Sequence, residues 1–152
     1  MNSGSEAETP VQIRLFSELS TEELYEILRA RVDVFVVEQN CPYPELDGKD
    51  RSAVHFFRKA EDGTILSYLR IYEAGTGMIQ IGRVLTRLRG KNYGRQLLHA
   101  AVEYAEQHWP DRTVMVEAQT YASGFYEKEG FRVCSEEFLE DGIPHVRMER
   151  AA

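Results

Sequence analysis

The chain has 152 residues, of which 43% are hydrophobic and 28% are charged. This composition excludes a disordered chain, a collagen-like repeat and a disulfide-stabilised mini-protein, and it predicts one globular domain with its own core. Eighteen Lys and Arg residues against 25 Asp and Glu residues give a net charge of −7. That balance argues against a general nucleic-acid or anionic-membrane binder, which needs a basic face.

Two cysteines, Cys41 and Cys134, stand far apart in the sequence, and neither has a second cysteine or a histidine cluster at metal-ligand spacing. We therefore expect two buried, reduced thiols and no metal site. No apolar run reaches the ~18 residues needed to span a membrane. Because the N-terminus also lacks the pattern of a signal peptide, we expect a cytoplasmic protein.

The first ten residues are small, polar and acidic, which predicts a disordered tail over 1–10 ahead of a domain over 11–152. Apolar residues alternate over 11–16 and predict a first strand. Apolar residues then recur at helical spacing and predict a helix from about 21 to 36, with Ser20 or Thr21 as its cap.

The middle of the chain predicts a long ordered loop followed by three strands. Residues 38–52 carry six charged side chains and two prolines, and ordered loops of this length are often functional. Strands are expected over 53–59 and 65–73, joined by a turn that contains Asp62-Gly63, and over 78–86.

The last third predicts a helix over 93–108, a strand over 113–118 and a short helix over 121–129 that Gly130 ends. Strands over 131–133 and 145–149 follow, joined through an acidic loop over 135–142. The alternation of helices and strands predicts a mixed α/β fold.

Residues 83–95 combine the end of a strand, a turn with Gly90 and Gly94, and the start of a helix. They contain five basic residues and no acidic one, so the rest of the chain carries a net charge of −12. Unpaired amides and the positive end of a helix dipole suit phosphate oxygens. The spacing excludes a P-loop and a dinucleotide fingerprint. Taken alone, the pattern equally fits a helix start with solvated arginines.

Two motifs in this order identify a family resemblance over residues 11–150. Residues 89–94, Arg-Gly-Lys-Asn-Tyr-Gly, resemble the pyrophosphate loop of GCN5-related N-acetyltransferases, and Phe125-Tyr126 with Gly130-Phe131 resembles the later motif of that family. Asn92 stands where glycine is usual, and asparagine is among the side chains that best tolerate a positive φ.

Three further segments, at 35–43, 47–50 and 140–145, are similar to the ElaA-type branch of that family. The resemblance implies a single domain with an α/β (α+β) fold. It has a central mixed, mostly antiparallel twisted sheet of six to seven strands, flanked by about four helices. It also implies transfer of an acetyl group from acetyl-CoA to a primary amine of a small molecule or peptide, by direct attack in a ternary complex. No metal, nucleic acid or membrane is implied, and an exposed sheet edge near the last strand allows a homodimer.

The resemblance also assigns roles to individual residues. Tyr126 takes the position of the general acid, whose phenol protonates or stabilises the departing thiolate. The expected acetyl-CoA-binding residues are Val84, Leu85, Thr86, Arg89, Gly90, Lys91, Asn92, Tyr93, Gly94, Arg95 and Tyr126.

The general base is open between Glu38, His55 and His145, each of which could relay a proton or serve only as a structural residue. Acidic residues of 38–52 and of 136–141 could form a negative mouth for a cationic amine.

A second hypothesis is a catalytically weak acyl-CoA-binding or partner-binding module on the same fold, because a fold does not guarantee activity. A third, a nucleotide-binding regulator, lacks any adenine- or magnesium-specific pattern. The presence of Tyr126 favours the enzyme.

Overall fold

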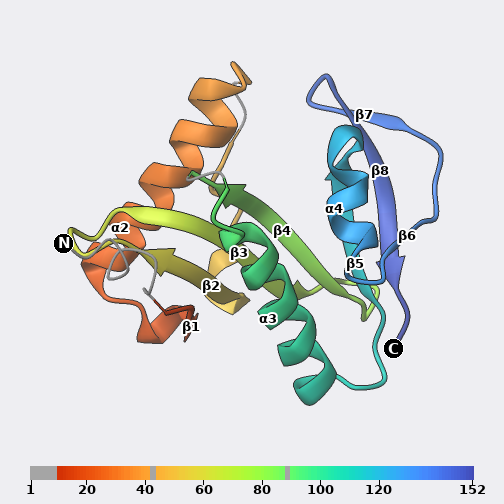
Figure 1. Ribbon diagram of the computed structural model, residues 1–152, viewed down its shortest axis with the longest axis horizontal. Helices are drawn as coiled ribbons and strands as arrows, with labels where there is room; N and C mark the ends of the chain where they lie inside the picture. Colours follow the sequence, from red (N-terminus) through yellow and green to blue (C-terminus); the bar gives the residue numbers. More distant parts are fainter. Residues whose placement is uncertain (1–9, 42–43, 88–89) are drawn as a thin grey trace. The chain divides into compact units, whose positions relative to one another are not determined.

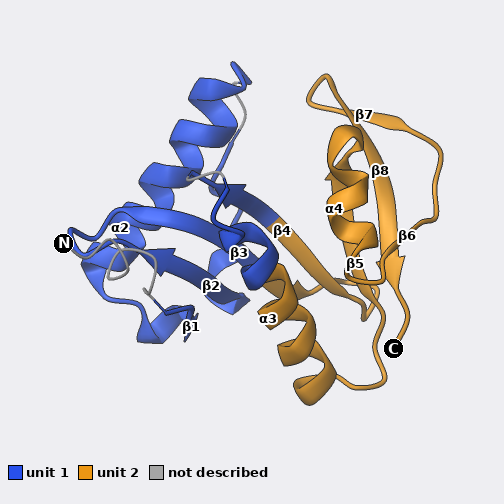
Figure 2. Cartoon of the chain, in the orientation of Figure 1, with its two compact units in different colours: residues 1–70, 83–97 blue, residues 71–82, 98–152 orange. Residues whose placement is uncertain are grey.

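The computed structural model describes residues 10–41, 44–87 and 90–152 (Figure 1). The predicted disordered tail, apart from Pro10, lies outside the described residues. The chain forms two compact units, the first from residues 1–70 and 83–97 and the second from residues 71–82 and 98–152 (Figure 2).

Three elements contain residues of both units: β3 (Ile65–Glu73), β4 (Ile79–Thr86) and α3 (Tyr93–His108). The first unit also holds β1 (Gln12–Leu15), β2 (Val54–Lys59) and α2 (Thr21–Arg31). Short 3-10 turns occupy η1 (Phe16–Glu18) and η3 (Asp50–Ser52). β1 pairs antiparallel with β2, and β3 and β4 follow as the next neighbours.

Helix α2 begins where the sequence predicts and ends earlier. The Ser20 hydroxyl accepts a hydrogen bond from the Glu23 amide at 3.0 Å, and the Glu23 carboxylate accepts one from the Ser20 amide, so the predicted cap at Ser20 is confirmed. After Arg31 the chain widens into a π-helix, η2 (Val32–Glu38). This segment is rich in valine, whose branched side chain crowds the preceding turn of an α-helix.

The core of the first unit lies between α2 and the strands. Buried side chains from α2, β2, β3 and β4 form one cluster: Ile27, Ala30, Phe57, Ile65, Tyr68 and Leu85. Val34 and Phe35 of η2 pack against its margin. The apolar face that the helical spacing predicts therefore packs on the sheet.

The second unit is built around β5 (Val114–Gln119) and β8 (Ile143–Arg150), which pair antiparallel. Residues Ile79–Ile81 of β4 pair parallel with Val114–Val116 of β5. On its other side β8 pairs with β6 (Arg132–Val133) and β7 (Phe138–Glu140). The 3-10 turn η4 (Thr120–Ala122) leads from β5 into α4 (Ser123–Glu127).

The outer edge of β8 is interrupted between β6 and β7. The Cys134 amide donates to the Arg147 carbonyl at 2.9 Å, and the Arg147 amide donates to the Ser135 hydroxyl at 2.9 Å. A side-chain oxygen therefore takes the place of a strand partner at this point.

Three expectations need correction. The acidic segment 135–142 is not only a loop, because it contains β7, so the described residues hold eight strands rather than six to seven. They contain three α-helices, where about four helices were expected, because η2 and the short turns are not α-helical. Cys41 is buried as expected, but Cys134 is exposed.

Six charged side chains form a largely buried network in the first unit, which we call the arginine cluster. The Arg31 side chain, 1% exposed, donates from Nε to Glu45 Oε2 at 2.7 Å and from Nη1 to Asp50 Oδ1 at 2.6 Å. The remaining members belong to β3, β4 and the segment before η3: Arg70, Arg83 and Asp47.

The cluster joins elements that are distant in sequence. Arg70 donates to Asp47 at 2.5 Å and to Asp50 at 2.8 Å, and Arg83 donates from Nε to Glu45 at 2.7 Å. Burial alone would raise the pKa of Asp47 and Asp50, but the hydrogen bonds and charges of the arginines outweigh it and hold both pKa values below their ordinary range. Both carboxylates are therefore ionised at neutral pH.

Asp50→Asn tests the energetic weight of this cluster. The substitution leaves two buried guanidinium groups short of one negative charge, so the free energy of unfolding falls by about 3 kcal/mol in urea denaturation followed by circular dichroism. Glu26→Gln is the control, because its partner Arg29 is 63% exposed and 3.7 Å away; it changes stability by less than about 0.5 kcal/mol. Equal effects of the two substitutions would contradict the assignment.

Candidate functional site

The turn before α3 has the backbone conformation that a ligand-binding loop requires. Gly90 has φ +80° and Asn92 has φ +59°, so the expectation that Asn92 tolerates a left-handed conformation is confirmed. A Cβ at Gly90 would meet no atom within 4 Å, so its φ rather than lack of space calls for glycine. The Asn92 carbonyl accepts the Gln96 amide at 3.0 Å, which places this turn directly at the N-terminus of α3.

Arg58 of β2 anchors the first turn of α3. Its guanidinium lies over the Tyr93 ring, 5.0 Å from the centroid, and it donates a hydrogen bond to the Gln96 side chain. Tyr93 and Gly94 are buried, whereas Lys91, Asn92 and Arg95 are exposed. The helix N-terminus is thus held on the sheet while polar side chains of the turn face solvent.

The basic residues of 83–95 divide into two groups. Arg83 belongs to the arginine cluster, and Arg87 pairs with Asp33 of η2 at 3.5 Å. Lys91 and Arg95 are exposed, with no ion pair recorded for either within the described part of the chain. Arg89 lies outside the described residues. Fewer of these basic residues are therefore available to a ligand than the sequence alone indicates.

The expected binding segment of β4 follows the end of its ladder with β5. Recorded pairing of these strands ends at Ile81 and Val116, although β4 continues to Thr86. Leu85 is buried, Val84 is half-buried and Thr86 is exposed.

Tyr126 lies on α4, in the second unit. Its ring is 5% exposed and packs edge-on against Phe125 and Phe131, with centroids 5.0 and 6.0 Å away. Burial, together with nearby Tyr121, raises the pKa of the Tyr126 phenol above its ordinary value. The hydroxyl is therefore protonated at neutral pH and available as a donor.

His55 is enclosed in the first unit. It is fully buried, its Nε2 lies 2.9 Å from the Asp50 carbonyl and its Nδ1 lies 2.6 Å from the Tyr68 hydroxyl. Because a carbonyl only accepts, Nε2 carries the proton and Nδ1 accepts from Tyr68. Burial lowers the pKa of His55, so the ring is neutral. With both nitrogens engaged, His55 is explained as a structural residue.

His145 has a different environment. It lies at the start of β8, opposite Gln119 of β5, and stacks on Phe138 of β7 at 6.0 Å between ring centroids. Its Nδ1 lies 2.7 Å from the Ile143 carbonyl, which places the proton on Nδ1 and leaves the lone pair on Nε2. Its Nε2 lies 3.7 Å from Glu140 Oε2.

The remaining candidate, Glu38, is exposed at the last position of η2. The other acidic residues of 38–52 do not form a free negative surface, since Glu45, Asp47 and Asp50 pair with arginines inside the arginine cluster. Sequence patterns did not identify this cluster, because its partners are 14 to 38 residues apart.

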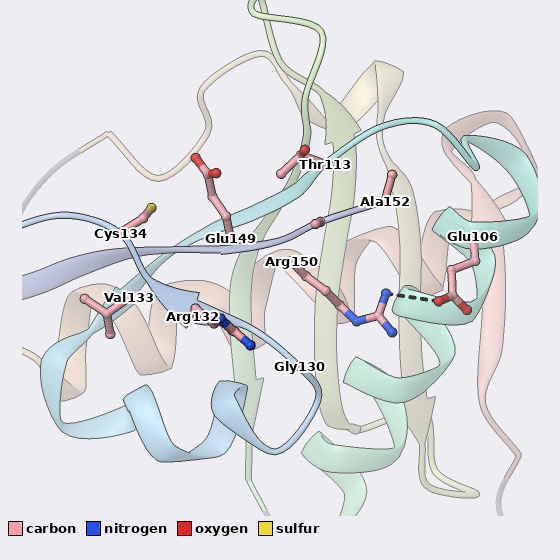
Figure 3. A pocket seen from close by; sticks show the side chains of 10 residues that line it. Glu106, Thr113, Gly130, Arg132, Val133, Cys134, Glu149, Arg150 and Ala152 are labelled. Carbon is pink, nitrogen blue, oxygen red and sulfur yellow. Dashed lines mark hydrogen bonds and ion pairs between the residues drawn. The ribbon is translucent and has the colours of Figure 1, made fainter.

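The second unit also contains a hollow beside β6 and the end of β8 (Figure 3). Arg150 crosses it and donates to Glu106 of α3 at 3.0 Å and to the Glu129 carbonyl at 2.9 Å. None of the residues expected to bind or react with a ligand lines it: the lining is Glu106, Thr113, Gly130, Arg132, Val133, Cys134, Glu149, Arg150, Ala151 and Ala152.

Two negative findings concern the described residues alone. They include no group of three or more His, Cys, Asp or Glu side chains that could hold a metal ion. They also include no helix that is long and apolar enough to cross a membrane.

A family model described as "Acetyltransferase (GNAT) domain" matches residues 15–152, which include parts of both units. The chain belongs to the GNAT acetyltransferase family, as the two motifs indicate.

Among its relatives is the ElaA protein of Escherichia coli, which is 41% identical over 140 residues, or 88% of this chain and 91% of ElaA. The crystal structure of that ElaA has a TM-score of 0.86 and covers 93% of this chain and 99% of its own. An acyl-CoA N-acyltransferase of Pseudomonas aeruginosa has the same TM-score at 38% identity and the same coverage. The fold and the resemblance to the ElaA-type branch are thereby confirmed.

A more distant structure, a Bacillus subtilis acetyltransferase in complex with CoA, has a TM-score of 0.63 at 20% identity and covers 94% of this chain and 99% of its own. At this identity the likeness concerns the fold alone.

Proposed function

We propose that the chain is an acetyl-CoA-dependent N-acetyltransferase that transfers an acetyl group to a primary amine of a small molecule or peptide. The observation that carries the proposal is the turn at Gly90 and Asn92, two left-handed residues directly before α3. Their amides and the helix dipole suit the pyrophosphate of CoA, and exposed Lys91 and Arg95 add positive charge. The likeness to the acyl-CoA N-acyltransferase of Pseudomonas aeruginosa, at 38% identity, supports an acyl-CoA as the co-substrate.

The pantetheine arm is assigned to the backbone of Val84, Leu85 and Thr86, which follow the paired part of β4. An extended ligand can add to free strand groups in the manner of an extra strand. The proposed pyrophosphate contacts are the amides of residues 90–94 and the side chains of Lys91 and Arg95.

The reaction forms a bond between the amine nitrogen and the acetyl carbon and breaks the bond between that carbon and sulfur. A base takes a proton from the nitrogen, and the departing thiolate gains one. Tyr126 is the donor to sulfur. Because its pKa is raised and a thiol has an ordinary pKa of about 8.5, the phenol stabilises the thiolate by hydrogen bonding and keeps its own proton. The thiolate then takes up a proton from solvent, to which the base releases the proton it took from the nitrogen.

We assign the base to His145, whose Nε2 carries the lone pair, with Glu140 placed to stabilise the protonated ring. Exposed Glu38 is the remaining alternative.

Arg95→Glu tests the pyrophosphate site. Reversing an exposed charge at the helix N-terminus raises the Kd for CoA about tenfold at low salt, and by less at high salt because ions screen the interaction. Isothermal titration calorimetry at two salt concentrations measures this. Arg29→Glu, at an exposed arginine of α2, is the control and leaves the Kd unchanged. If both variants bind CoA as wild type does, the loop is not the site.

Tyr126→Phe tests the donor. The ring keeps its packing but loses the hydroxyl, so kcat falls about 100-fold while the Kd for CoA stays within about twofold. The assay is thiol release from acetyl-CoA with a pooled panel of polyamines, amino acids, aminoglycosides and peptides. Tyr25→Phe, at a side chain 62% exposed, is the matched control. Tight CoA binding by the wild-type protein without release for any amine would favour the binding module instead.

His145→Gln tests the base. We expect kcat to fall about 100-fold at neutral pH with little change in CoA affinity, because proton removal is affected and cofactor binding is not. His99→Gln, at an exposed histidine of α3, keeps wild-type turnover. A fully active His145→Gln variant would transfer the assignment to Glu38.

A further inference from the structure

Strand β4 contains one extra residue relative to its neighbour β3. The Ala74 amide binds the Met78 carbonyl at 2.7 Å, and this register would place Leu66 opposite Thr86. Instead the Arg87 amide donates to the Leu66 carbonyl at 2.8 Å. One residue of β4 between these two bonds is therefore accommodated as a β-bulge.

Arg83 marks the position of this bulge. It has φ +56° in the middle of β4, where the preceding residue, Gly82, does not adopt a left-handed conformation. Bulges of this kind usually place glycine at the left-handed position, and a residue with a Cβ there costs about 1 to 2 kcal/mol. A strained residue persists where its surroundings hold it in place.

Glu45 holds Arg83 in this conformation with two hydrogen bonds. Arg83 Nε donates to Glu45 Oε2 at 2.7 Å, and Arg83 Nη2 donates to the Glu45 carbonyl at 3.0 Å. The same carboxylate oxygen and the same carbonyl also accept from Arg31, at 2.7 and 3.2 Å. The Glu45 side chain is 3% exposed, so this interaction is little screened by solvent.

We propose that Glu45 is a positioning residue for acetyl-CoA binding, because it fixes the bulge at Arg83 and thereby the backbone of Val84–Thr86. This inference rests on the proposed function, in which that backbone binds the pantetheine arm. Glu45 connects Arg31 of α2 to the binding strand, so the segment that precedes η3 sets the geometry of β4 without contacting the ligand itself.

Three variants separate positioning from a general loss of stability. Glu45→Gln keeps the size of the side chain but removes its negative charge, which weakens the hydrogen bond from Arg83 Nε. Asp50→Asn weakens the same arginine cluster through Arg31 and Arg70, and Asp50 makes no recorded ion pair with Arg83 in the described residues. Arg83→Gly supplies a residue that adopts a positive φ without help.

The first measurement is the Kd for CoA by calorimetry at a temperature where every variant is folded. Glu45→Gln raises the Kd about tenfold, Asp50→Asn leaves it within about twofold, and Arg83→Gly binds nearly as well as wild type. Adding Glu45→Gln to Arg83→Gly produces little further loss of CoA affinity, because glycine adopts the positive φ without hydrogen bonds to Glu45. Equal losses in Glu45→Gln and Asp50→Asn, or no loss in Glu45→Gln, would overturn the proposal.

The second measurement does not depend on a ligand. Amide hydrogen exchange of Val84–Thr86 in the ligand-free protein becomes faster in Glu45→Gln and stays close to wild type in Asp50→Asn when rates are compared relative to global stability. Unchanged exchange in Glu45→Gln would overturn the positioning role. If the two variants show this exchange pattern but the wild-type protein binds no CoA, the result would contradict the proposed function instead.

Discussion

The buried guanidinium of Arg31 is the constraint on which the first unit depends. All three of its nitrogens donate hydrogen bonds, two to Glu45 and one to Asp50. A charge with 1% exposure is tolerated only when it is paired and hydrogen-bonded, so the segment from Glu45 to Asp50 has to fold onto α2. Arg70 and Arg83 then extend the same pairing to β3 and β4.

This pairing determines which charged side chains of the first unit are available to a ligand. Glu45, Asp47 and Asp50 neutralise arginines of the same unit, so they do not present a negative surface to an amine. Arg83 and Arg87 likewise have acidic partners, so among the described residues of 83–95 the cations left for a ligand are the exposed Lys91 and Arg95. Charge counted along the sequence measures composition, whereas burial and pairing decide which charges a ligand meets.

Features governed by local rules could be predicted from the sequence. The Ser20 cap, the tolerance of Asn92 for a positive φ and the start of α3 each depend on residues within one or two turns of the chain. The family motifs also correctly indicated the fold.

Features that depend on partners distant in the chain could not be predicted from the sequence. The arginine cluster and the bulge at Arg83 are set by contacts between segments far apart in the chain, and β7 lies within a strongly acidic segment where pairing with β8 overrides local preference. The change from α2 to a π-helix likewise has no periodicity that distinguishes it from an ordinary helix.

The interruption at Ser135 affects how this sheet can associate. Beyond β8 the edge consists of β6, with two residues, and β7, with three. The two strands are separated where the Ser135 hydroxyl accepts a hydrogen bond from the Arg147 amide. A strand from another molecule would therefore meet two short runs instead of the five or six aligned residues that a typical strand offers. Such an edge limits strand-by-strand aggregation, and it makes side-chain packing a better basis than a continuous intermolecular sheet for any dimer formed at this end.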